Sequence, residues 1–449
     1  MKAIRLRTEY LQDPIGIDIL RPRLFWNCED GLRQTAYEIS AATDTGEILW
    51  RSGKVHSSSM HCPWGAEAIS PKTKVIWSVR LWDENDICGD WSAATFETGI
   101  DAWSAKWITG NYIVNPTKRY PVDCFRKCFD TNDITKARLY ITACGVYEAK
   151  MNSQRCGNFI LAPGVTDYRK RVQYQTIDVT DLLTPGKNTL EVQLADGWYR
   201  GSCGAWGLKN QYGTQTKLLA QLEITKTDGS VQTILSDESW DWSNDGPIRF
   251  ADNKDGEIVD DNCQPSYCGK AKRTHHKATP TASNNVPVVE KERFSARKIL
   301  TPSGKTVLDF GQNIAGYVSF RCNAKAGQKI TLRFGEMLDQ NGEFTQENFQ
   351  LTMGKKTTPL QKVEYTCKEA VAVTAEFAEN ESVAIDTPKP VFAADMPESE
   401  VISVNGLSRL SINGQLTSPV LFFGNTDFPN PNGVTTSQAG FAADAGIHL

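Results

Sequence analysis

Residues 194–207, LADGWYRGSCGAWG, gather side chains that commonly bind polar ligands. A β-type run, residues 188–194, leads directly into this Gly-rich segment, which carries Asp196, Trp198, Tyr199, Arg200 and Trp206. Aromatic rings stack on the apolar face of a sugar, while carboxylate and guanidinium groups form hydrogen bonds with its hydroxyls. Glycines allow a backbone to approach a ligand closely. The segment therefore predicts a carbohydrate site.

The same residues permit a structural interpretation. Trp198, Tyr199 and Trp206 could form a buried aromatic corner between two sheets, with Arg200 paired to Asp196. Composition alone leaves both interpretations open. Asp196 is also a possible calcium ligand, since calcium prefers oxygen ligands.

A second polar segment lies at residues 251–262, ADNKDGEIVDDN. Its five acidic residues surround Gly256, and they could bind calcium or sugar hydroxyls. The full spacing of an EF-hand loop is not present. We expect Asp255 and Glu257 to join the carbohydrate site if the two segments meet. The alternative is a solvated acidic loop.

Composition excludes several other functions. The net charge of −4 gives no basic footprint for nucleic acid, and no apolar run approaches membrane-spanning length. The 12 cysteines are scattered without a CxxC pair, and the N-terminus does not resemble a signal peptide. We therefore expect reduced thiols and a cytoplasmic location. With 5 histidines and no Gly-rich phosphate loop, neither a zinc site nor a nucleotide site is expected.

The elements that must position these residues are short strands separated by turns, which predicts an all-β chain of tandem β-sandwiches. An immunoglobulin- or fibronectin-like unit is expected over residues 5–100, where Val75–Trp82 alternates apolar and polar positions. A jelly-roll unit is expected over residues 104–290 and a third sandwich over residues 293–368. The 449 residues leave room for an irregular tail.

The tail, residues 370–449, begins with an acidic stretch whose composition indicates a linker. Asn413-Gly414 favours a tight hairpin turn. An apolar strand is expected over residues 418–424, and residues 439–449 look like the start of a helix and of the strand after it.

Four segments carry a resemblance to bacterial α-L-rhamnosidases of glycoside hydrolase family 78. They are RPRLFW at residues 21–26, the two segments quoted above, and VLDFGQNIAGYVSF with ITLRFGEMLDQNGEFTQENFQ between residues 307 and 350. Each segment is weak alone, but their order and spacing are specific. The resemblance covers residues 5–368.

The resemblance implies an immunoglobulin-like module, a carbohydrate-binding-like β-sandwich and a concanavalin-like sandwich, followed by an (α/α)6 barrel that holds the catalytic acids. No barrel pattern is found after residue 369, and no catalytic residue is assigned. The tail loosely resembles the start of a β-galactosidase-type glycosidase barrel, which would need about 250 residues. We therefore expect a truncated or fused gene product.

The expected function is recognition of rhamnose-containing glycans without hydrolysis. Two alternatives remain. One is an active α-L-rhamnosidase, which hydrolyses terminal α-L-rhamnosides with inversion of configuration. The other is a structural fragment with no ligand.

Overall fold

The computed structural model describes residues 1–203, 208–320, 325–346, 350–353, 356–359, 362–367, 399–404, 407–412 and 415–416. Within these ranges the chain is built from strands, together with the short helix α1 (Gly197–Arg200) and the 3-10 turn Thr180–Leu182. The all-β prediction is confirmed. None of the described helices has the length and hydropathy needed to span a bilayer. The chain divides into two compact units, residues 1–380 and residues 381–449.

The N-terminal immunoglobulin-like domain consists of two sheets. Strand β8 (Lys74–Trp82) follows the predicted alternation, since Val75, Trp77, Val79 and Leu81 are all fully buried. One sheet has the order β1 (Lys2–Thr8), β3 (Arg23–Glu29), β7 (His61–Pro63). The other has the order β2 (Ile15–Ile17), β9 (Ser92–Thr98), β8 (Lys74–Trp82), β4 (Ala36–Thr43), β5 (Ile48–Arg51), with β6 (Val55–His56) paired to β4.

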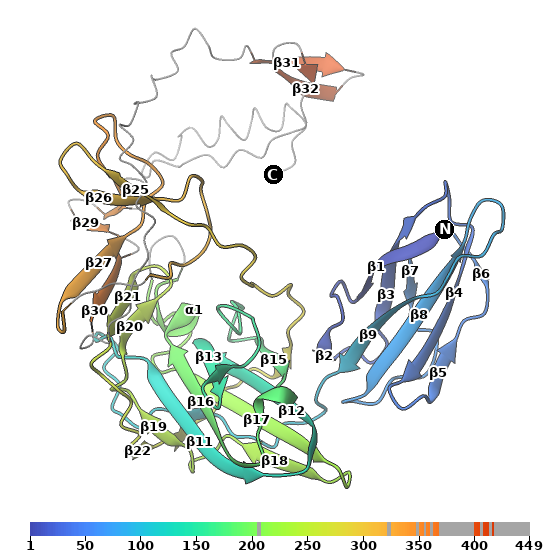
Figure 1. Cartoon of the computed structure of the whole chain (residues 1–449), viewed down its shortest axis with the longest axis horizontal. Helices are drawn as coiled ribbons and strands as arrows, with labels where there is room; N and C mark the ends of the chain where they lie inside the picture. Colours follow the sequence, from blue (N-terminus) through green and yellow to red (C-terminus); the bar gives the residue numbers. More distant parts are fainter. Residues whose placement is uncertain are drawn as a thin grey trace. The chain divides into compact units, whose positions relative to one another are not determined.

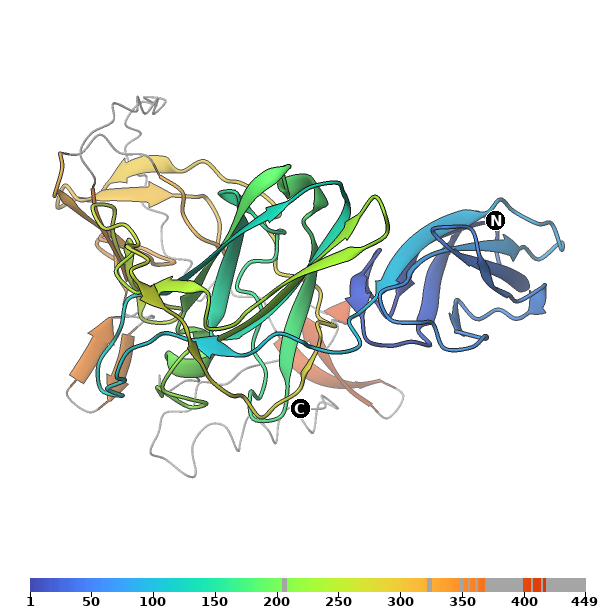
Figure 2. The ribbon, with the colours of Figure 1, turned by 90° about the horizontal axis from the view of Figure 1, so that it is seen from below.

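The second domain is a larger sandwich, seen as two layers of green strands in Figures 1 and 2. One sheet contains β23 (Lys272–Arg273), β10 (Ile108–Thr109), β17 (Lys217–Lys226), β12 (Ile134–Cys144), β15 (Val172–Asp178) and β24 (Pro280–Ala282), with β18 (Val231–Leu235) paired to β17. The other contains β14 (Gln154–Arg155), β13 (Val146–Met151), β16 (Gly186–Ala195), β11 (Asp123–Thr131), β19 (Asp241–Ser243) and β22 (Gly269–Lys270).

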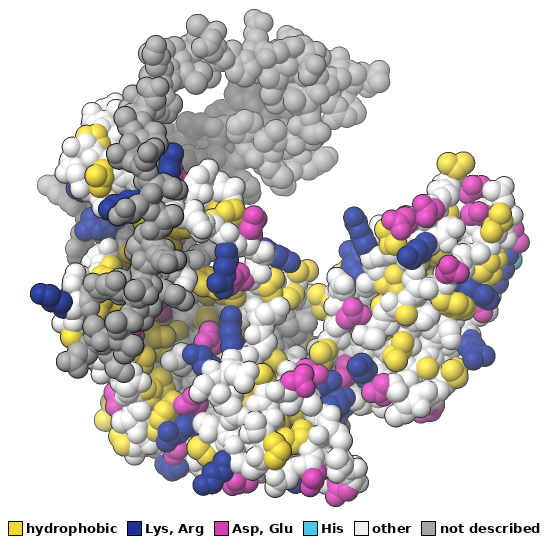
Figure 3. Space-filling model, viewed as in Figure 1, with side chains coloured by type: hydrophobic (Ala, Val, Ile, Leu, Met, Phe, Trp, Pro, Cys, Tyr) yellow, Lys and Arg dark blue, Asp and Glu magenta, His cyan; other side chains and the backbone are white. Residues whose placement is uncertain are grey.

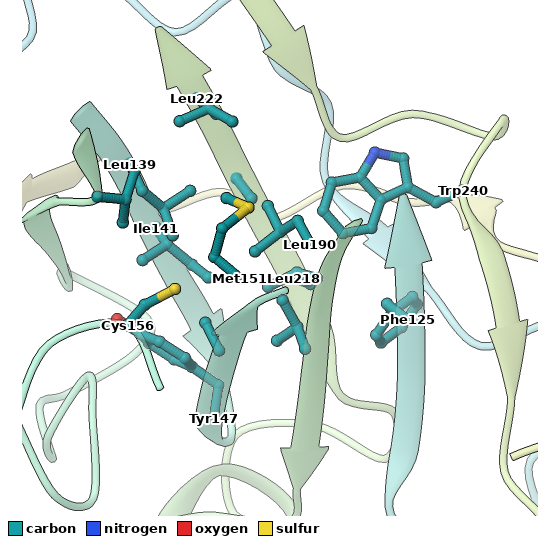
Figure 4. Packing of buried hydrophobic residues seen from close by; sticks show 14 of the residues in the cluster. Phe125, Leu139, Ile141, Tyr147, Met151, Cys156, Leu190, Leu218, Leu222 and Trp240 are labelled. Carbon is teal, nitrogen blue, oxygen red and sulfur yellow. The ribbon is translucent and has the colours of Figure 1, made fainter. Parts of the chain in front are cut away.

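The apolar core of this sandwich lies between the two sheets. Leu139 and Leu222 come from one sheet and Met151 and Leu190 from the other, and all four are 0–1% exposed (Figure 4). Burying large apolar side chains from both layers is the main favourable term in such a fold. It holds the ends of β11 and β16 in fixed positions.

A third group of strands includes a sheet of β20 (Ile248–Asp252), β21 (Gly256–Asp260), β30 (Lys362–Thr366) and β27 (Lys329–Arg333). Strand β21 pairs in parallel with β30, so this sheet joins residues on both sides of the predicted boundary near residue 290. The predicted second unit therefore contributes a hairpin to the third. Two further pairs are β25 (Arg297–Leu300) with β26 (Thr306–Asp309) and β28 (Gln350–Met353) with β29 (Lys356–Pro359).

The C-terminal unit contains β31 (Ser399–Val404), β32 (Leu407–Ile412) and β33 (Gln415–Leu416) in one antiparallel sheet. Ile412 lies opposite Gln415, as a hairpin at Asn413-Gly414 requires. The turn itself lies outside the described residues. So do the predicted linker up to residue 398, the strand at 418–424 and the helix start at 439–449.

Within the first unit, the immunoglobulin-like domain meets the sandwich through a buried ion pair. Glu97 Oε2 lies 2.9 Å from Arg138 Nη2, and the two residues are 2% and 7% exposed. Arg138 also pairs with Asp178 at 2.8 Å. The Tyr174 hydroxyl donates a hydrogen bond of 2.5 Å to Asp18 across the same junction.

Candidate functional site

The predicted site begins where β16 ends. Leu194, on β16, lies opposite Asp123 of β11 on one side and Tyr147 of β13 on the other. After Ala195 the chain turns into α1, which Figure 1 shows at the end of β16. The pairing of β16 with β11 and β13 therefore fixes the point at which this segment leaves the sandwich.

Two glycines let this turn pack against protein rather than against a ligand. Gly197 has a φ of +52°, and a Cβ there would lie 2.9 Å from backbone atoms of Gly145 and Val146. A Cβ on Gly201 would lie 2.4 Å from the carbonyl oxygen of Gly197 and 2.6 Å from Asp252 Oδ2. Only glycine fits such approaches without displacing its neighbours.

Asp196 and Arg200 form a buried ion pair one helical turn apart. Arg200 Nε donates a hydrogen bond of 2.7 Å to Asp196 Oδ1, and Arg200 Nη1 donates one of 2.5 Å to the Tyr112 hydroxyl. Arg200 Nη2 lies 2.5 Å from the same Asp196 oxygen as an ion-pair contact, but it has no partner in hydrogen-bond geometry. Arg200 is only 5% exposed, so its guanidinium is a buried charge whose ionic partner is Asp196.

A second carboxylate, Asp123, lies near the guanidinium of Arg200. It is fully buried and accepts hydrogen bonds from the Thr216 hydroxyl at 2.5 Å and from Trp242 Nε1 at 3.0 Å. Sequence reasoning missed Asp123, because only the pairing of β11 with β16 brings it to the end of residues 188–194.

Burial dominates the electrostatics of this group. It raises the pKa of Asp123 and of Asp196, although the positive charge of Arg200 acts in the opposite direction. Burial also lowers the pKa of Arg200, but the charges of Asp196 and Asp123 outweigh this effect and the net pKa is raised. Arg200 therefore stays charged. Ionisation of the Asp123 or Asp196 carboxyl group costs free energy because each group is buried.

The predicted stacking residues are differently exposed. Tyr199 is 3% exposed and lies edge-on to Tyr168, with ring centroids 5.3 Å apart, inside an apolar cluster. Trp198 is partly buried and packs against the same cluster. Trp206 lies outside the described residues. The structural interpretation, a buried aromatic corner, therefore holds for Tyr199, whose ring is not accessible to a ligand.

The acidic segment meets α1 through Asp252. This residue is 8% exposed, and its Oδ2 accepts a hydrogen bond of 2.7 Å from the Ser202 backbone N–H. Asp255 pairs with Arg119 and, at 3.2 Å, with Lys209. The Arg119 guanidinium also lies 4.3 Å from the centre of the Phe250 ring. The two predicted segments are therefore joined, with Asp255 on the outer side.

Glu257 lies on β21, opposite Ala251 and Val363, and burial raises its pKa. Glu257 is not among the residues that line the small hollow beside Asp196 and Arg200. The described residues do not fit calcium at Asp196, because one of its oxygens is held by Arg200 and no cluster of three or more acidic, His or Cys ligands is found among them.

A small hollow opens beside the ion pair. It has a volume of about 50 Å³, and its lining includes Asp196, Arg200, Arg119, Lys209 and Phe250. This space admits one or two groups the size of water, so a sugar ring would have to lie over it with a hydroxyl inserted.

Sequence reasoning named Asp196, Arg200 and Asp255 but missed most of the lining of this hollow. Arg119, Lys209 and Phe250 come from three separate segments, and only the folded chain brings them together. Charged residues on loops gave no signal that distinguished them from ordinary surface residues.

Comparisons with known proteins match the described domains in chain order. The Rha78A-like N-terminal immunoglobulin domain matches residues 3–102, and the α-L-rhamnosidase N-terminal domain matches residues 132–299. The bacterial α-L-rhamnosidase concanavalin-like domain matches residues 299–377. The chain carries N-terminal domains of the α-L-rhamnosidases of family 78.

Individual rhamnosidases extend this result. An α-L-rhamnosidase of Formosa agariphila is 31% identical over 381 residues, which are 76% of this chain and 40% of the relative. The crystal structure of an Aspergillus terreus α-L-rhamnosidase matches with a TM-score of 0.73 and 31% identity, over 82% of this chain and 44% of that one. A Streptomyces avermitilis α-L-rhamnosidase, solved in complex with L-rhamnose, matches with a TM-score of 0.71 and 25% identity, over 84% of this chain and 54% of that one.

These shares show that the chain spans about half the length of the rhamnosidases it matches. The resemblance stated from the sequence is confirmed, including the immunoglobulin-like and concanavalin-like domains.

Proposed function

We propose that these rhamnosidase domains bind rhamnose-containing glycans and, by themselves, do not hydrolyse them. The observation that carries the binding proposal is the small hollow itself, whose lining combines the Asp196–Arg200 ion pair with Arg119, Lys209 and Phe250. A sugar hydroxyl placed in the hollow would accept a hydrogen bond from a charged donor of this lining, and such hydrogen bonds are among the stronger kinds.

The rim of the hollow supports the same ligand class. Lys209 is partly exposed and Arg119 lies over the Phe250 ring, so charged donors and an aromatic ring lie side by side. Asp196 and Asp252 add acceptor oxygens to the lining, and Asp255, outside it, pairs with Arg119 and Lys209. Hydroxyl groups both donate and accept hydrogen bonds, and they suit a surface that carries both signs of charge. The relative solved with L-rhamnose makes this sugar the first ligand to test.

The absence of hydrolysis is proposed from the family resemblance and from the elements present. An inverting glycosidase needs two carboxylates on either side of the scissile bond, about 6.5–9.5 Å apart. The resemblance assigns these acids to a helical barrel, whereas the residues described here include a single four-residue α-helix.

The cytoplasmic location expected from the sequence stays a prediction.

The test is calorimetric titration of the purified chain with L-rhamnose and with a rhamnoside disaccharide. A single small site would bind near millimolar concentration, or about −4 kcal/mol. Arg200→Lys removes the planar fork and its Nη2 donor but keeps the charge, so affinity should fall about tenfold or more. Arg126→Lys is the matched control, because Arg126 pairs with Asp241 elsewhere on the sandwich.

Since Arg200 is buried, a thermal melt must show that each variant is folded. Lys209→Ala gives a second measurement on the exposed rim, where unfolding is not expected. Binding that neither Arg200→Lys nor Lys209→Ala weakens would contradict the proposed site. A folded chain that binds neither sugar would favour the structural alternative, for which the closed Asp196–Arg200 pair is the supporting observation.

Hydrolysis is tested with an aryl α-L-rhamnoside. We expect no turnover above that of a mock preparation. Activity that survives stringent purification, and that is lost when one carboxylate within residues 1–368 is changed, would establish the enzyme alternative.

A further inference from the structure

A second cavity, larger than the Asp196 hollow, lies away from it at the junction of the immunoglobulin-like domain and the sandwich. Its volume is about 580 Å³, within the range of about 300–1,000 Å³ that small-molecule sites occupy. Residues 7–16 form one side, and strands β13 and β15 with residues 155–162 form the other. We call this cavity the junction groove. Domain interfaces are a preferred place for ligand sites.

The two sides of the junction groove are held in fixed positions. The buried Glu97–Arg138 ion pair and the Tyr174–Asp18 hydrogen bond connect the two domains beside it. Gly16, with a φ of +82°, approaches β15 so closely that a Cβ would lie 1.9 Å from Thr176 Oγ1. Thr176 Oγ1 is buried and has no hydrogen-bond partner. Such contacts preform the groove, which lowers the cost of ordering on binding.

An aromatic ring is presented at the groove. Tyr10 remains 56% exposed although its ring stacks on Phe25 with centroids 4.8 Å apart. Arg23 lies over the same ring and donates a hydrogen bond of 3.2 Å to the Tyr10 hydroxyl. Phe25 and Arg23 therefore hold Tyr10 in place while leaving much of it accessible. A braced, exposed tyrosine is suited to stacking on a flat apolar ligand face.

The charges at the junction groove are balanced. Arg155 lies 3.5 Å from Glu148, and Asp178 is paired with Arg138. Arg7 is also in the lining. Because the carboxylates of Glu148 and Asp178 would repel a polyanion, a phosphorylated ligand is disfavoured. A neutral ligand rich in hydroxyls can use both the guanidinium and the carboxylate groups. On the face shown in Figure 3, acidic and basic side chains are likewise interspersed.

We propose that the junction groove binds a short neutral oligosaccharide, with Tyr10 stacked on one sugar ring. This site shares no lining residue with the Asp196 hollow. It therefore stands or falls independently of the function proposed above.

The test is titration of the full chain with neutral oligosaccharides, namely an α-linked L-rhamnose disaccharide, cellotriose and maltotriose. Tyr10→Ala removes the stacking face and should weaken binding about three- to tenfold. Asn158→Trp places a large side chain at an exposed position of the lining and should block the groove. Tyr317→Ala is the matched control, because Tyr317 is another exposed tyrosine, at 61%, outside the groove.

Loss of affinity in both groove variants, with the Tyr317→Ala protein unchanged for the same sugar, supports the proposal. It is overturned if the wild type binds none of the three sugars, or if the groove variants bind as well as the wild type. Tighter binding of digalacturonate than of the neutral sugars would overturn the neutral ligand class. Thermal melts of all variants distinguish a lost contact from a lost fold.

Discussion

The sandwich of the second domain and the strands of the third group share the same sequence pattern but not the same burial. In β16 every second residue from Asn188 to Leu194 is 0–1% exposed. Strands β26 and β27 alternate only between exposed and intermediate positions, and β25 has three exposed positions and one intermediate position. Leu300 and Leu308 are 56% and 45% exposed. No described residue after Ala282 belongs to an apolar core cluster.

The difference shows what alternation can and cannot specify. A period of two determines which side chains share a face, and it requires only one strand. Burial requires a second layer facing that strand, and in the sandwich this layer comes from residues far away in the sequence. The β11–β16 sheet faces the β12–β17 sheet, and the core fills the space between them (Figure 4).

The largest effect expected from this difference follows from truncating one apolar side chain in each region. Trp240 is fully buried, and its Nε1 donates a hydrogen bond of 2.8 Å to the Leu235 carbonyl. Trp240→Ala should destabilise the sandwich by about 3–5 kcal/mol through the cavity it leaves. Leu308→Ala, on the exposed β26, should change stability by no more than about 0.5 kcal/mol.

Urea unfolding followed by far-UV circular dichroism measures both changes. Because several domains contribute, the midpoint of each transition is compared rather than one overall free energy. Equal effects of the two substitutions would remove the distinction between the two regions.

What the sequence could predict follows the same division. The strands, the immunoglobulin-like domain and the resemblance to rhamnosidases depend on local patterns, and they are confirmed. The Asp196–Arg200 pair was part of the structural alternative, and the structure contains it, although the helical turn α1 that spaces the two residues was not predicted. Asp123 and Arg119 could not be foreseen, because the pairing of β11 with β16 and the position of residues 116–119 are long-range features. The burial of Tyr199 also depended on Tyr168, far away in sequence.

Ion pairs at the domain junction provide the next comparison, of a buried pair with an exposed one. Glu97→Ala leaves Arg138 buried with Asp178 as its remaining acidic partner, and should cost about 3 kcal/mol. Lys72 pairs with Glu223 at 3.3 Å and is 40% exposed, so Lys72→Ala should cost at most about 1 kcal/mol.

These two effects can be read from the midpoint of thermal unfolding at low ionic strength and again in 0.5 M salt. Added salt should reduce the effect of Lys72→Ala more than that of Glu97→Ala, because exposed pairs are screened more strongly. If the two variants have the same midpoint of thermal unfolding, the junction is less closely packed than its burial indicates. The two sides of the junction groove would then not be held in fixed positions.

The smallest effect concerns two adjacent histidines, one packed and one exposed. His276 lies against Trp107, with ring centroids 5.3 Å apart, and its Nε2 has no hydrogen-bond partner. Burial, followed by the charge of Lys217, lowers the pKa of His276 from 6.5 to about 4. The unfolded chain therefore binds a proton at this residue more readily than the folded chain does. Stability is fully present above pH 6.5 and falls as the pH drops toward 4.

A shift of this size corresponds to about 3 kcal/mol for a fully enclosed group, and to about 1–2 kcal/mol for a half-buried one in contact with solvent. His276→Gln should remove that part of the pH dependence, whereas His275→Gln, at the exposed neighbour, removes only the smallest of the causes acting on the pKa of His276 and should change it little. Urea midpoints measured at pH 7, 5.5 and 4.5 for the three proteins give the comparison. The carboxylates common to all three cancel in the differences. A wild-type curve that runs parallel to the His276→Gln curve across this range would show that burial does not lower the pKa of His276.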